Sequence, residues 1–259
     1  MQGLMTDIPL LIKSILVHAE RNHPNQEIVS VTADHVRHRY DYRRWAQRCR
    51  VLANALNSLG ASPDGRIATL AWNDFRHLEL YFGIACSGRI YHTINPRLFA
   101  DQLIYIINHA EDEWIFTDVA FVPTLEEIFE KCPSVKGYVV MVDEAHMPDT
   151  RLPGVRCYET LMESASDVFD WPDFDENRAS GLCYTSGTTG DPKGCLYSHR
   201  STMLHTYAHA LPDVLGLSAL DSIMPIVPMF HVNAWGPVSY THLRAHETDS
   251  YLVCRLLLE

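Results

Sequence analysis

Apolar positions in the first 142 residues alternate between two spacings, about every second residue and about every third or fourth. The shorter period predicts strands and the longer one predicts amphipathic helices. Helices are predicted over residues 43–59, 77–86, 100–109 and 122–129, and strands over 66–71, 90–93, 113–117 and 136–142. This exchange of strand and helix is typical of an α/β protein with a mainly parallel sheet flanked by helices.

Glycines and polar runs mark where these elements end. Gly60 and Gly88 follow two predicted helices, where a left-handed cap would close the last turn. Residues 143–153 are rich in Asp and Pro, which predicts a surface loop. The apolar stretch 8–17 contains Lys13, which favours a first amphipathic helix over a signal peptide. No run approaches the roughly 20 apolar residues of a membrane span, so we expect a soluble chain.

Composition narrows the class of protein. With 47% apolar and 10% aromatic residues, the chain can build packed cores. A net charge of -11 argues against a general nucleic-acid binder, because a polyanion would be repelled. The seven cysteines are scattered and never form C-x-x-C, which indicates mostly buried, reduced thiols of an intracellular protein. We therefore expect a cytoplasmic location.

One polar segment carries the strongest chemical signal. A short apolar strand, residues 182–184, runs into a loop of small and hydroxyl residues. The loop residues are Thr185, Ser186, Gly187, Thr188, Thr189, Gly190, Asp191, Pro192, Lys193 and Gly194. Glycines let the backbone turn tightly, and exposed N–H and hydroxyl groups form a concavity suited to phosphate oxygens. Lys193 adds a positive charge. This pattern predicts a phosphate site.

Other known kinds of loop fit this segment less well. A plain Ser/Thr/Gly linker has no need of a lone Lys between Pro192 and Gly194, nor of an apolar strand before it. The P-loop pattern requires Ser or Thr after its Lys, where Gly194 stands, and the dinucleotide Gly-x-Gly is absent. A hydrolase elbow needs Gly where Tyr184 stands, and a zinc-helix pattern at His246 is not completed by Ser250.

The run 184–194 resembles the phosphate loop of the adenylate-forming (AMP-binding) superfamily, which includes acyl-CoA synthetases, luciferases and peptide-synthetase adenylation domains. Residues 198–200 resemble the start of the helix that follows this loop, with Ser198 as its cap. Residues 228–236 are most similar to the medium- and long-chain fatty-acyl-CoA synthetase branch, as are residues 73–79 and 92–98. The resemblance extends over most of the chain.

This resemblance implies an incomplete N-terminal adenylation domain over residues 1–237, with α/β architecture. It implies ATP-dependent activation of a carboxylic acid, a medium- or long-chain fatty acid, to acyl-AMP and then acyl-CoA. ATP, Mg²⁺ and CoA, the second substrate, are the implied small molecules. Residues 185–190 and Lys193 would hold the β- and γ-phosphates, and Thr185 would offer a hydroxyl ligand to the metal.

The stretch 228–236, called the second motif below, supplies the implied acid-binding residues. Phe230, His231, Val232 and Trp235 would lie beside the acyl group and adenylate, with His231 as the catalytic residue near the reacting carboxylate. Trp235 is a hypothetical wall or gate of an acyl channel. Alternatively, Phe230 and Trp235 are core residues and His231 is a satisfied buried histidine. His199 and Arg200 form a second hypothesis for phosphate contact, because a helix N-terminus favours anions.

The family pattern ends abruptly after Gly236. Residues 238–259 resemble translated sequencing-adapter read-through, and we expect them not to be native. The acidic Mg²⁺ motif, the ribose aspartate, the hinge and the small C-terminal domain with its lysine are missing, so the 259-residue chain alone should have little ligase activity.

Two functional alternatives remain: a ligase for an aryl, short-chain or sulfur-containing acid, and a non-catalytic nucleotide-binding or oligomerisation module. A homodimer of the full-length parent also stays open.

Overall fold

A seven-stranded sheet forms the centre of the computed structural model, which describes residues 5, 7–32, 37–185, 191–216, 221–235 and 254–256. The strand order is β7-β6-β5-β3-β4-β8-β9. The strands are β3 (Arg66–Leu70), β4 (Ile90–Thr93), β5 (Asp112–Thr117), β6 (Gly137–Val140), β7 (Arg156–Cys157), β8 (Ala179–Thr185) and β9 (Lys193–Ser198). Every neighbouring pair is parallel except β8 and β9. The predicted α/β fold with a mainly parallel sheet is confirmed.

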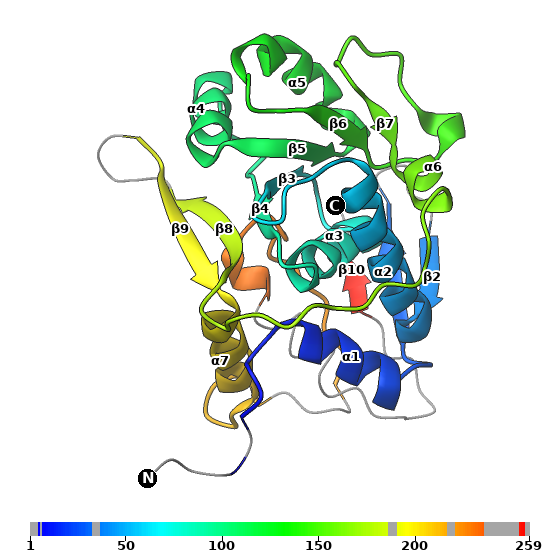
Figure 1. The fold of residues 1–259 in the computed structure, drawn as a ribbon, viewed down its shortest axis with the longest axis vertical. Coiled ribbons are helices and arrows are strands. Elements are labelled where there is room, and N and C mark those ends of the chain that lie inside the picture. The colour runs from blue at the N-terminus through cyan, green and yellow to red at the C-terminus, as the bar shows by residue number, and fades with distance from the viewer. Residues whose placement is uncertain are drawn as a thin grey trace.

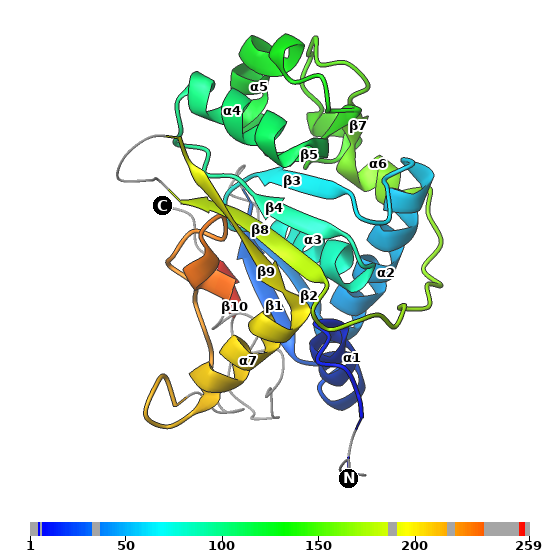
Figure 2. The ribbon, with the colours of Figure 1, turned by 60° about the vertical axis from the view of Figure 1, so that its left-hand side comes forward.

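Helices cover both faces of this sheet (Figures 1 and 2). The helices are α1 (Lys13–Asn22), α2 (Tyr42–Ser58), α3 (Phe75–Cys86), α4 (Ala100–Ala110), α5 (Val122–Ile128), α6 (Tyr158–Glu163) and α7 (His199–Ala210). Side chains alternate between two cores, because successive strand residues point to opposite faces. Ile67 packs with α1, α2 and α3, whereas its neighbour Ala68 packs with α4 and α5.

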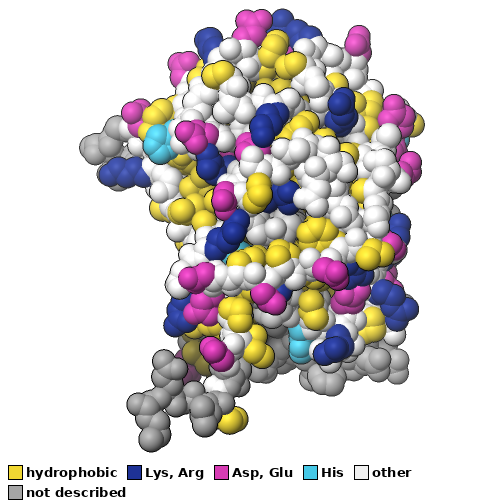
Figure 3. Space-filling model, viewed as in Figure 1, with side chains coloured by type: hydrophobic (Ala, Val, Ile, Leu, Met, Phe, Trp, Pro, Cys, Tyr) yellow, Lys and Arg dark blue, Asp and Glu magenta, His cyan; other side chains and the backbone are white. Residues whose placement is uncertain are grey.

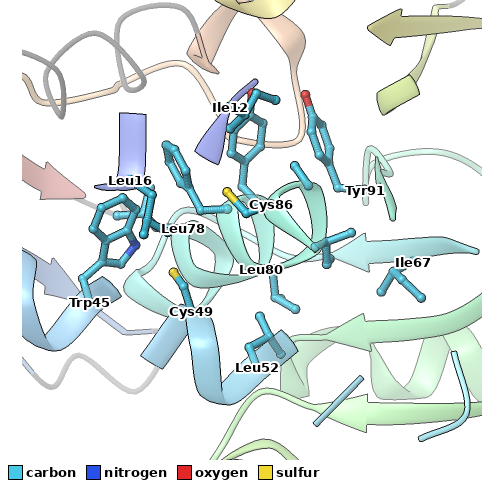
Figure 4. Packing of buried hydrophobic residues seen from close by; sticks show 14 of the residues in the cluster. Ile12, Leu16, Trp45, Cys49, Leu52, Ile67, Leu78, Leu80, Cys86 and Tyr91 are labelled. Carbon is cyan, nitrogen blue, oxygen red and sulfur yellow. The ribbon is translucent and has the colours of Figure 1, made fainter. Parts of the chain in front are cut away.

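The larger core is built around α3. Figure 4 shows side chains of α2, among them Trp45 and Cys49, packed against the α3 helix that carries Leu78 and Leu80, with α1 residues above. These four side chains are fully buried. The predicted helix over residues 43–59 therefore exists because its apolar stripe is covered by another helix rather than by the sheet alone.

A second, smaller sheet has the order β10-β1-β2, in which β1 (Glu27–Val31) lies between β2 (Arg37–Asp41) and β10 (Cys254–Leu256). Short 3₁₀ turns in the described residues are η1 (Val119–Phe121), η2 (Phe129–Lys131), η3 (Glu144–His146) and η4 (Val232–Ala234). Apart from β10, residues 238–259 lie outside the described part of the chain. The division of the chain at residue 237 stays a prediction.

Most predicted elements appear within two residues of their expected bounds, and Gly60 and Gly88 have the left-handed φ values of 68° and 86° expected of caps. The first helix differs, because α1 begins at Lys13 rather than at residue 8. The N–H groups of Leu10 and Ile12 instead donate hydrogen bonds to the Glu176 carboxylate and to His199 Nδ1. Cys49, Cys86, Cys132, Cys157, Cys183 and Cys195 are free, and all of these except Cys195 are buried. No helix in the described ranges combines the length and apolar character needed to cross a membrane.

Candidate functional site

The predicted phosphate loop connects two antiparallel strands. Thr185, the last residue of β8, lies directly opposite Lys193, the first residue of β9, so β8 and β9 form the two antiparallel arms of a hairpin (Figure 1). The strand predicted at 182–184 is confirmed as the end of β8, whereas Lys193 and Gly194 belong to β9 rather than to the loop. Ser186, Gly187, Thr188, Thr189 and Gly190 lie outside the described residues, so their role stays a prediction.

A cleft of about 220 Å³ joins the two sequence motifs. Thr185 and Pro192 line it from the hairpin, and Phe230, His231 and Val232 line it from the second motif. The remaining lining comes from the ends of β4 and β8 and from α4: His92, Thr93, Ile94, Asn95, Leu98, Gln102, Ile106, Cys183 and Tyr184. Ligands of α/β proteins bind at such carboxyl ends of strands.

The base of the hairpin offers polar groups to this cleft. The side chains of Thr185 and Lys193 are exposed. Tyr184, just before them, is held by a 2.6 Å hydrogen bond between its hydroxyl and His109 Nδ1. Lys193 follows Pro192 and faces Thr185 across the two strands, and both of these neighbours line the cleft. An ammonium group at this position can meet an anionic ligand held there.

The second motif is held in place by Asn73, a residue to which sequence reasoning gave no role. Its buried side-chain amide donates hydrogen bonds to the carbonyls of Pro225 (3.1 Å) and Val227 (3.2 Å) and accepts one from the Met229 N–H. A primary amide both donates and accepts, so it can fix a segment that has no ladder of its own. Asn73 follows β3 and lies in the stretch 73–79 that resembles the family. This position was the one sign in the sequence that Asn73 could have a role at the site.

Phe230 and His231 are placed differently. Phe230 is 8% exposed, and its ring centroid lies 5.9 Å from that of Trp72. The His231 side chain is exposed and lines the cleft, while its backbone N–H donates to the Pro228 carbonyl (2.9 Å). The alternative in which His231 is a buried core histidine is therefore wrong.

Trp235 lines a separate cavity of about 320 Å³. Its ring stacks on Tyr81 with centroids 3.6 Å apart and an interplanar angle of 13°. Tyr81, Tyr91, Tyr197, Ser201, Thr202, His205 and Val232 complete the lining, and Val232 also lines the first cleft. The two hollows therefore share one lining residue of the second motif, Val232.

Buried His77 supports Trp235 from α3. Its ring centroid lies 5.8 Å from that of Trp235 in an edge-on contact. Its Nε2 and Nδ1 bond to the Thr69 hydroxyl (3.0 Å) and the Trp72 carbonyl (2.9 Å). Burial lowers the pKa of His77 to about 4, so the ring is neutral at pH 7. Because Nδ1 must then donate to the carbonyl, the ring is fixed in one tautomer and one orientation.

The hypothesis that His199 and Arg200 contact the phosphates is wrong. Ser198 does cap α7, accepting the Ser201 N–H at 3.0 Å as predicted. However, β9 separates this helix start from the hairpin loop by about 20 Å at roughly 3.3 Å per residue. His199 is buried and accepts the Ile12 N–H, and Arg200 pairs with Glu176. The helix N-terminus lies at the opposite end of the hairpin (Figure 2).

The described residues contain no group of three or more His, Cys, Asp or Glu side chains that could hold a metal ion. A Mg²⁺ ion bound to a nucleotide keeps several waters and phosphate oxygens and uses only one or two protein ligands. The exposed hydroxyl of Thr185 beside the cleft meets that modest requirement. The Thr185 hydroxyl is thus one group at the cleft that fits a Mg²⁺ ion carried by a nucleotide.

The sequence model of the family described as AMP-binding enzyme matches residues 16–247. The chain belongs to this family. It is 50% identical over 236 residues to a 3-methylmercaptopropionyl-CoA ligase of Ruegeria lacuscaerulensis, and 49% identical over 236 residues to a medium-chain-fatty-acid–CoA ligase of Ectopseudomonas oleovorans. These alignments cover 91% of the chain but only 44% and 43% of the two relatives. The chain thus spans less than half the length of these AMP-binding relatives.

A long-chain-fatty-acid–CoA ligase of Thermus thermophilus is 40% identical over 231 residues, covering 89% of the chain and 41% of that protein. Among solved structures, an anthranilate CoA ligase in complex with anthranoyl-AMP superposes with a TM-score of 0.84 at 20% identity, covering 99% of the chain and 46% of that structure. A long-chain-fatty-acid-CoA ligase from Archaeoglobus fulgidus gives 0.79 at 19% identity, covering 93% and 46%. These structural matches show that the chain has the fold of the AMP-binding enzymes.

Proposed function

We propose that this AMP-binding chain carries the nucleotide- and acid-binding part of an acyl-CoA ligase, which converts a carboxylic acid to acyl-AMP and then to acyl-CoA. The observation that carries the proposal is the single cleft where the hairpin residues Thr185 and Pro192 meet Phe230, His231 and Val232. A ligase of this kind must bring a triphosphate and a carboxylate together. The two motifs supply one wall of the cleft each.

The chemical difficulty is the approach of one anion to another. In the proposal, Thr185, Ser186, Gly187, Thr188, Thr189 and Gly190 surround the β- and γ-phosphates of ATP with N–H and hydroxyl donors. Lys193 adds a full positive charge at the base of the hairpin. Mg²⁺, when bound with the nucleotide, neutralises further phosphate charge, and Thr185 offers it a hydroxyl oxygen. CoA is the thiol that takes the acyl group in the second step.

His231 is proposed as the catalytic residue beside the reacting carboxylate. Its exposed side chain lines the cleft, and the segment before it is fixed by Asn73. In the full-length parent, His231→Ala should lower the rate of acid-dependent pyrophosphate release by about 100-fold, within the range usual for a positioned acid–base group. His18→Ala, in α1 and outside the linings of both this cleft and the cavity beside Trp235, is the matched control. An unchanged rate in His231→Ala contradicts the assignment.

The proposed acid is a medium- or long-chain fatty acid. Phe230 and Trp235 supply aromatic surface, and the cavity of about 320 Å³ beside Trp235 offers room for an acyl group. The 50% identity to a 3-methylmercaptopropionyl-CoA ligase favours a sulfur-containing acid as the second candidate. A panel of fatty, aryl, short-chain and sulfur-containing acids, assayed on the full-length parent, separates these candidates by their kcat/KM values.

Trp235 is proposed as the wall that limits the acyl group. If so, Trp235→Ala in the full-length parent should shift the preference toward longer chains, because the indole that stacks on Tyr81 is removed. If the order of preferred chain lengths is unchanged, Trp235 is not the wall that limits the acyl group.

A non-catalytic nucleotide-binding module predicts instead that the parent binds ATP but releases no pyrophosphate with any acid.

A further inference from the structure

A buried histidine–aspartate pair lies beneath the cleft. His92 of β4 and Asp112 at the start of β5 are both fully buried, and His92 Nδ1 lies 2.9 and 2.8 Å from the two carboxylate oxygens of Asp112. Strand β3 runs between them, and its residue opposite His92 is Ala68. The small Ala68 side chain leaves room for the two larger groups to meet across the strand.

One nitrogen of this pair faces no protein partner. His92 Nε2 is buried and has no hydrogen-bond partner among the described residues, although the ring is part of the cleft lining. Buried His77 differs, because both of its nitrogens are bonded. Leaving a buried polar atom without a hydrogen-bond partner destabilises the fold. Its position at the cleft indicates a partner that enters with the ligand.

The charge of the pair determines what that partner must be. Two buried groups are best tolerated when their total charge is zero. The pair is neutral either as a carboxylate with an imidazolium, or as a carboxylic acid that donates to Nδ1 of a neutral ring. In both forms Nε2 carries a hydrogen. Burial raises the pKa of Asp112, which favours the form in which its carboxyl group is protonated. The nearby Arg66 guanidinium is itself bonded to Glu111 and the Ala110 carbonyl.

We propose that His92, held by Asp112, is a ligand-binding residue whose Nε2–H donates a hydrogen bond to an anionic oxygen, phosphate or carboxylate, in the cleft. The inference rests on the proposed function and adds a donor beyond the phosphate loop. The same ring contacts Tyr184, with centroids 5.2 Å apart, immediately before Thr185. The pair therefore also supports the strand end from which the hairpin loop starts.

The test measures binding of two separate probes, pyrophosphate and octanoate, to the full 259-residue chain by calorimetry. Asp112→Asn can retain the Nδ1–H hydrogen bond but favours a neutral ring without a hydrogen on Nε2. His92→Phe removes both nitrogens and keeps an aromatic ring. Call the probe whose binding depends on the pair the responding probe. Either variant should lower the affinity for this probe by about 10- to 100-fold, the value of a hydrogen bond to a charged group. The control is His199→Gln, a buried histidine outside the cleft lining.

A second measurement does not depend on the stability of the variants. In the wild-type chain labelled with ¹⁵N-histidine, the responding probe should shift the His92 Nε2 resonance and leave that of His199 unchanged. Weakening confined to pyrophosphate assigns the contact to phosphate, and weakening confined to octanoate assigns it to carboxylate. Either result supports the inference.

Two results overturn it. If Lys193→Ala loses pyrophosphate affinity while both His92-pair variants and the His92 resonance stay unchanged, the inference fails and the proposed function stands. If the wild-type chain binds neither probe, both fail.

Discussion

Asn73 is the clearest example of a single side chain that positions the site without lining the cleft. Its amide holds residues 225–229 through three backbone hydrogen bonds. Asn73→Ala should lower the free energy of unfolding by about 1–3 kcal/mol, because buried backbone groups lose their partners. It should also speed hydrogen exchange of the Met229 amide.

Asn73→Asp serves as the matched variant, because it keeps an acceptor for the Met229 N–H and loses the two donated bonds. It should protect the Met229 amide better than Asn73→Ala does. If exchange at Met229 is unchanged in both variants, Asn73 does not hold this segment.

Asp118 and Asp74 make stability depend on pH. They line a second cleft of about 280 Å³. Burial, followed by repulsion from Asp74, raises the pKa of Asp118 to about 8. Burial also raises the pKa of Asp74 to about 6. The folded chain therefore holds more protons than the unfolded chain between about pH 4 and pH 8. The contribution of these two groups to stability must fall as pH rises through that range.

Asp118→Asn removes the charge that must otherwise be buried, and Asn can still accept the Trp72 N–H that Asp118 accepts at 2.7 Å. Relative to wild type, the variant should gain stability on the order of 1–3 kcal/mol at pH 8 and much less at pH 5. Urea unfolding at both pH values measures this difference. The exposed Asp149→Asn is the control, and an equal effect of Asp118→Asn at both pH values contradicts the account.

At the scale of elements, α7 depends on its cap. The Ser198 hydroxyl accepts the Ser201 N–H, and the Ser201 hydroxyl in turn accepts the Ser198 N–H, both at 3.0 Å. Ser198→Ala should cost about 1 kcal/mol of unfolding free energy, whereas Ser198→Thr retains the cap and should cost less. Equal losses in the two variants, measured by reversible urea unfolding, would show that the hydroxyl is not the stabilising group.

The parallel strands and their covering helices were predictable because their signals are local. Strand β4 has the bounds 90–93 that its apolar run predicts, and α3 starts two residues before its predicted first residue. Strand β9 was missed, because none of its residues is buried and they carry no apolar alternation. It is a strand because β8 offers it hydrogen bonds, which is information from a different part of the sequence.

The same limit applies to the site. Motif resemblance indicated Thr185 and Phe230, and the fold brings both to one cleft. The roles of Asn73 and of the His92–Asp112 pair depend on which strands are neighbours and where each one ends. The pattern of apolar and polar residues does not show which strands are neighbours or how their residues align. These contacts could therefore not be predicted.

At the scale of the molecule, charge is mixed rather than segregated. On the face shown in Figure 3, basic and acidic side chains are interspersed, although the net charge of the chain is -11. The overall field therefore does not attract an anion, and a bound phosphate must be held by nearby donors. This agrees with a proposal in which the hairpin and the cleft supply the affinity.

Apolar side chains are exposed along the edge strand β9 and helix α7, including Leu196, Leu204 and Tyr207. Exposed apolar side chains beside an edge strand favour self-association. The chain should therefore sediment as concentration-dependent oligomers, and Leu204→Lys should shift it toward monomer. Val168→Lys, at an exposed position outside these two elements, should have no such effect. A monomeric wild type at all concentrations contradicts this prediction.

Binding of MgATP to the 259-residue chain, followed by calorimetry, tests the central claim most directly. Wild type should bind, and Lys193→Ala should weaken binding by about tenfold or more, since it removes the charged group at the base of the hairpin. Lys131→Ala, an exposed lysine in η2, should bind as wild type does. Equal affinity of Lys193→Ala and wild type, or no binding by wild type, would contradict the claim that this hairpin holds the polyphosphate of a nucleotide.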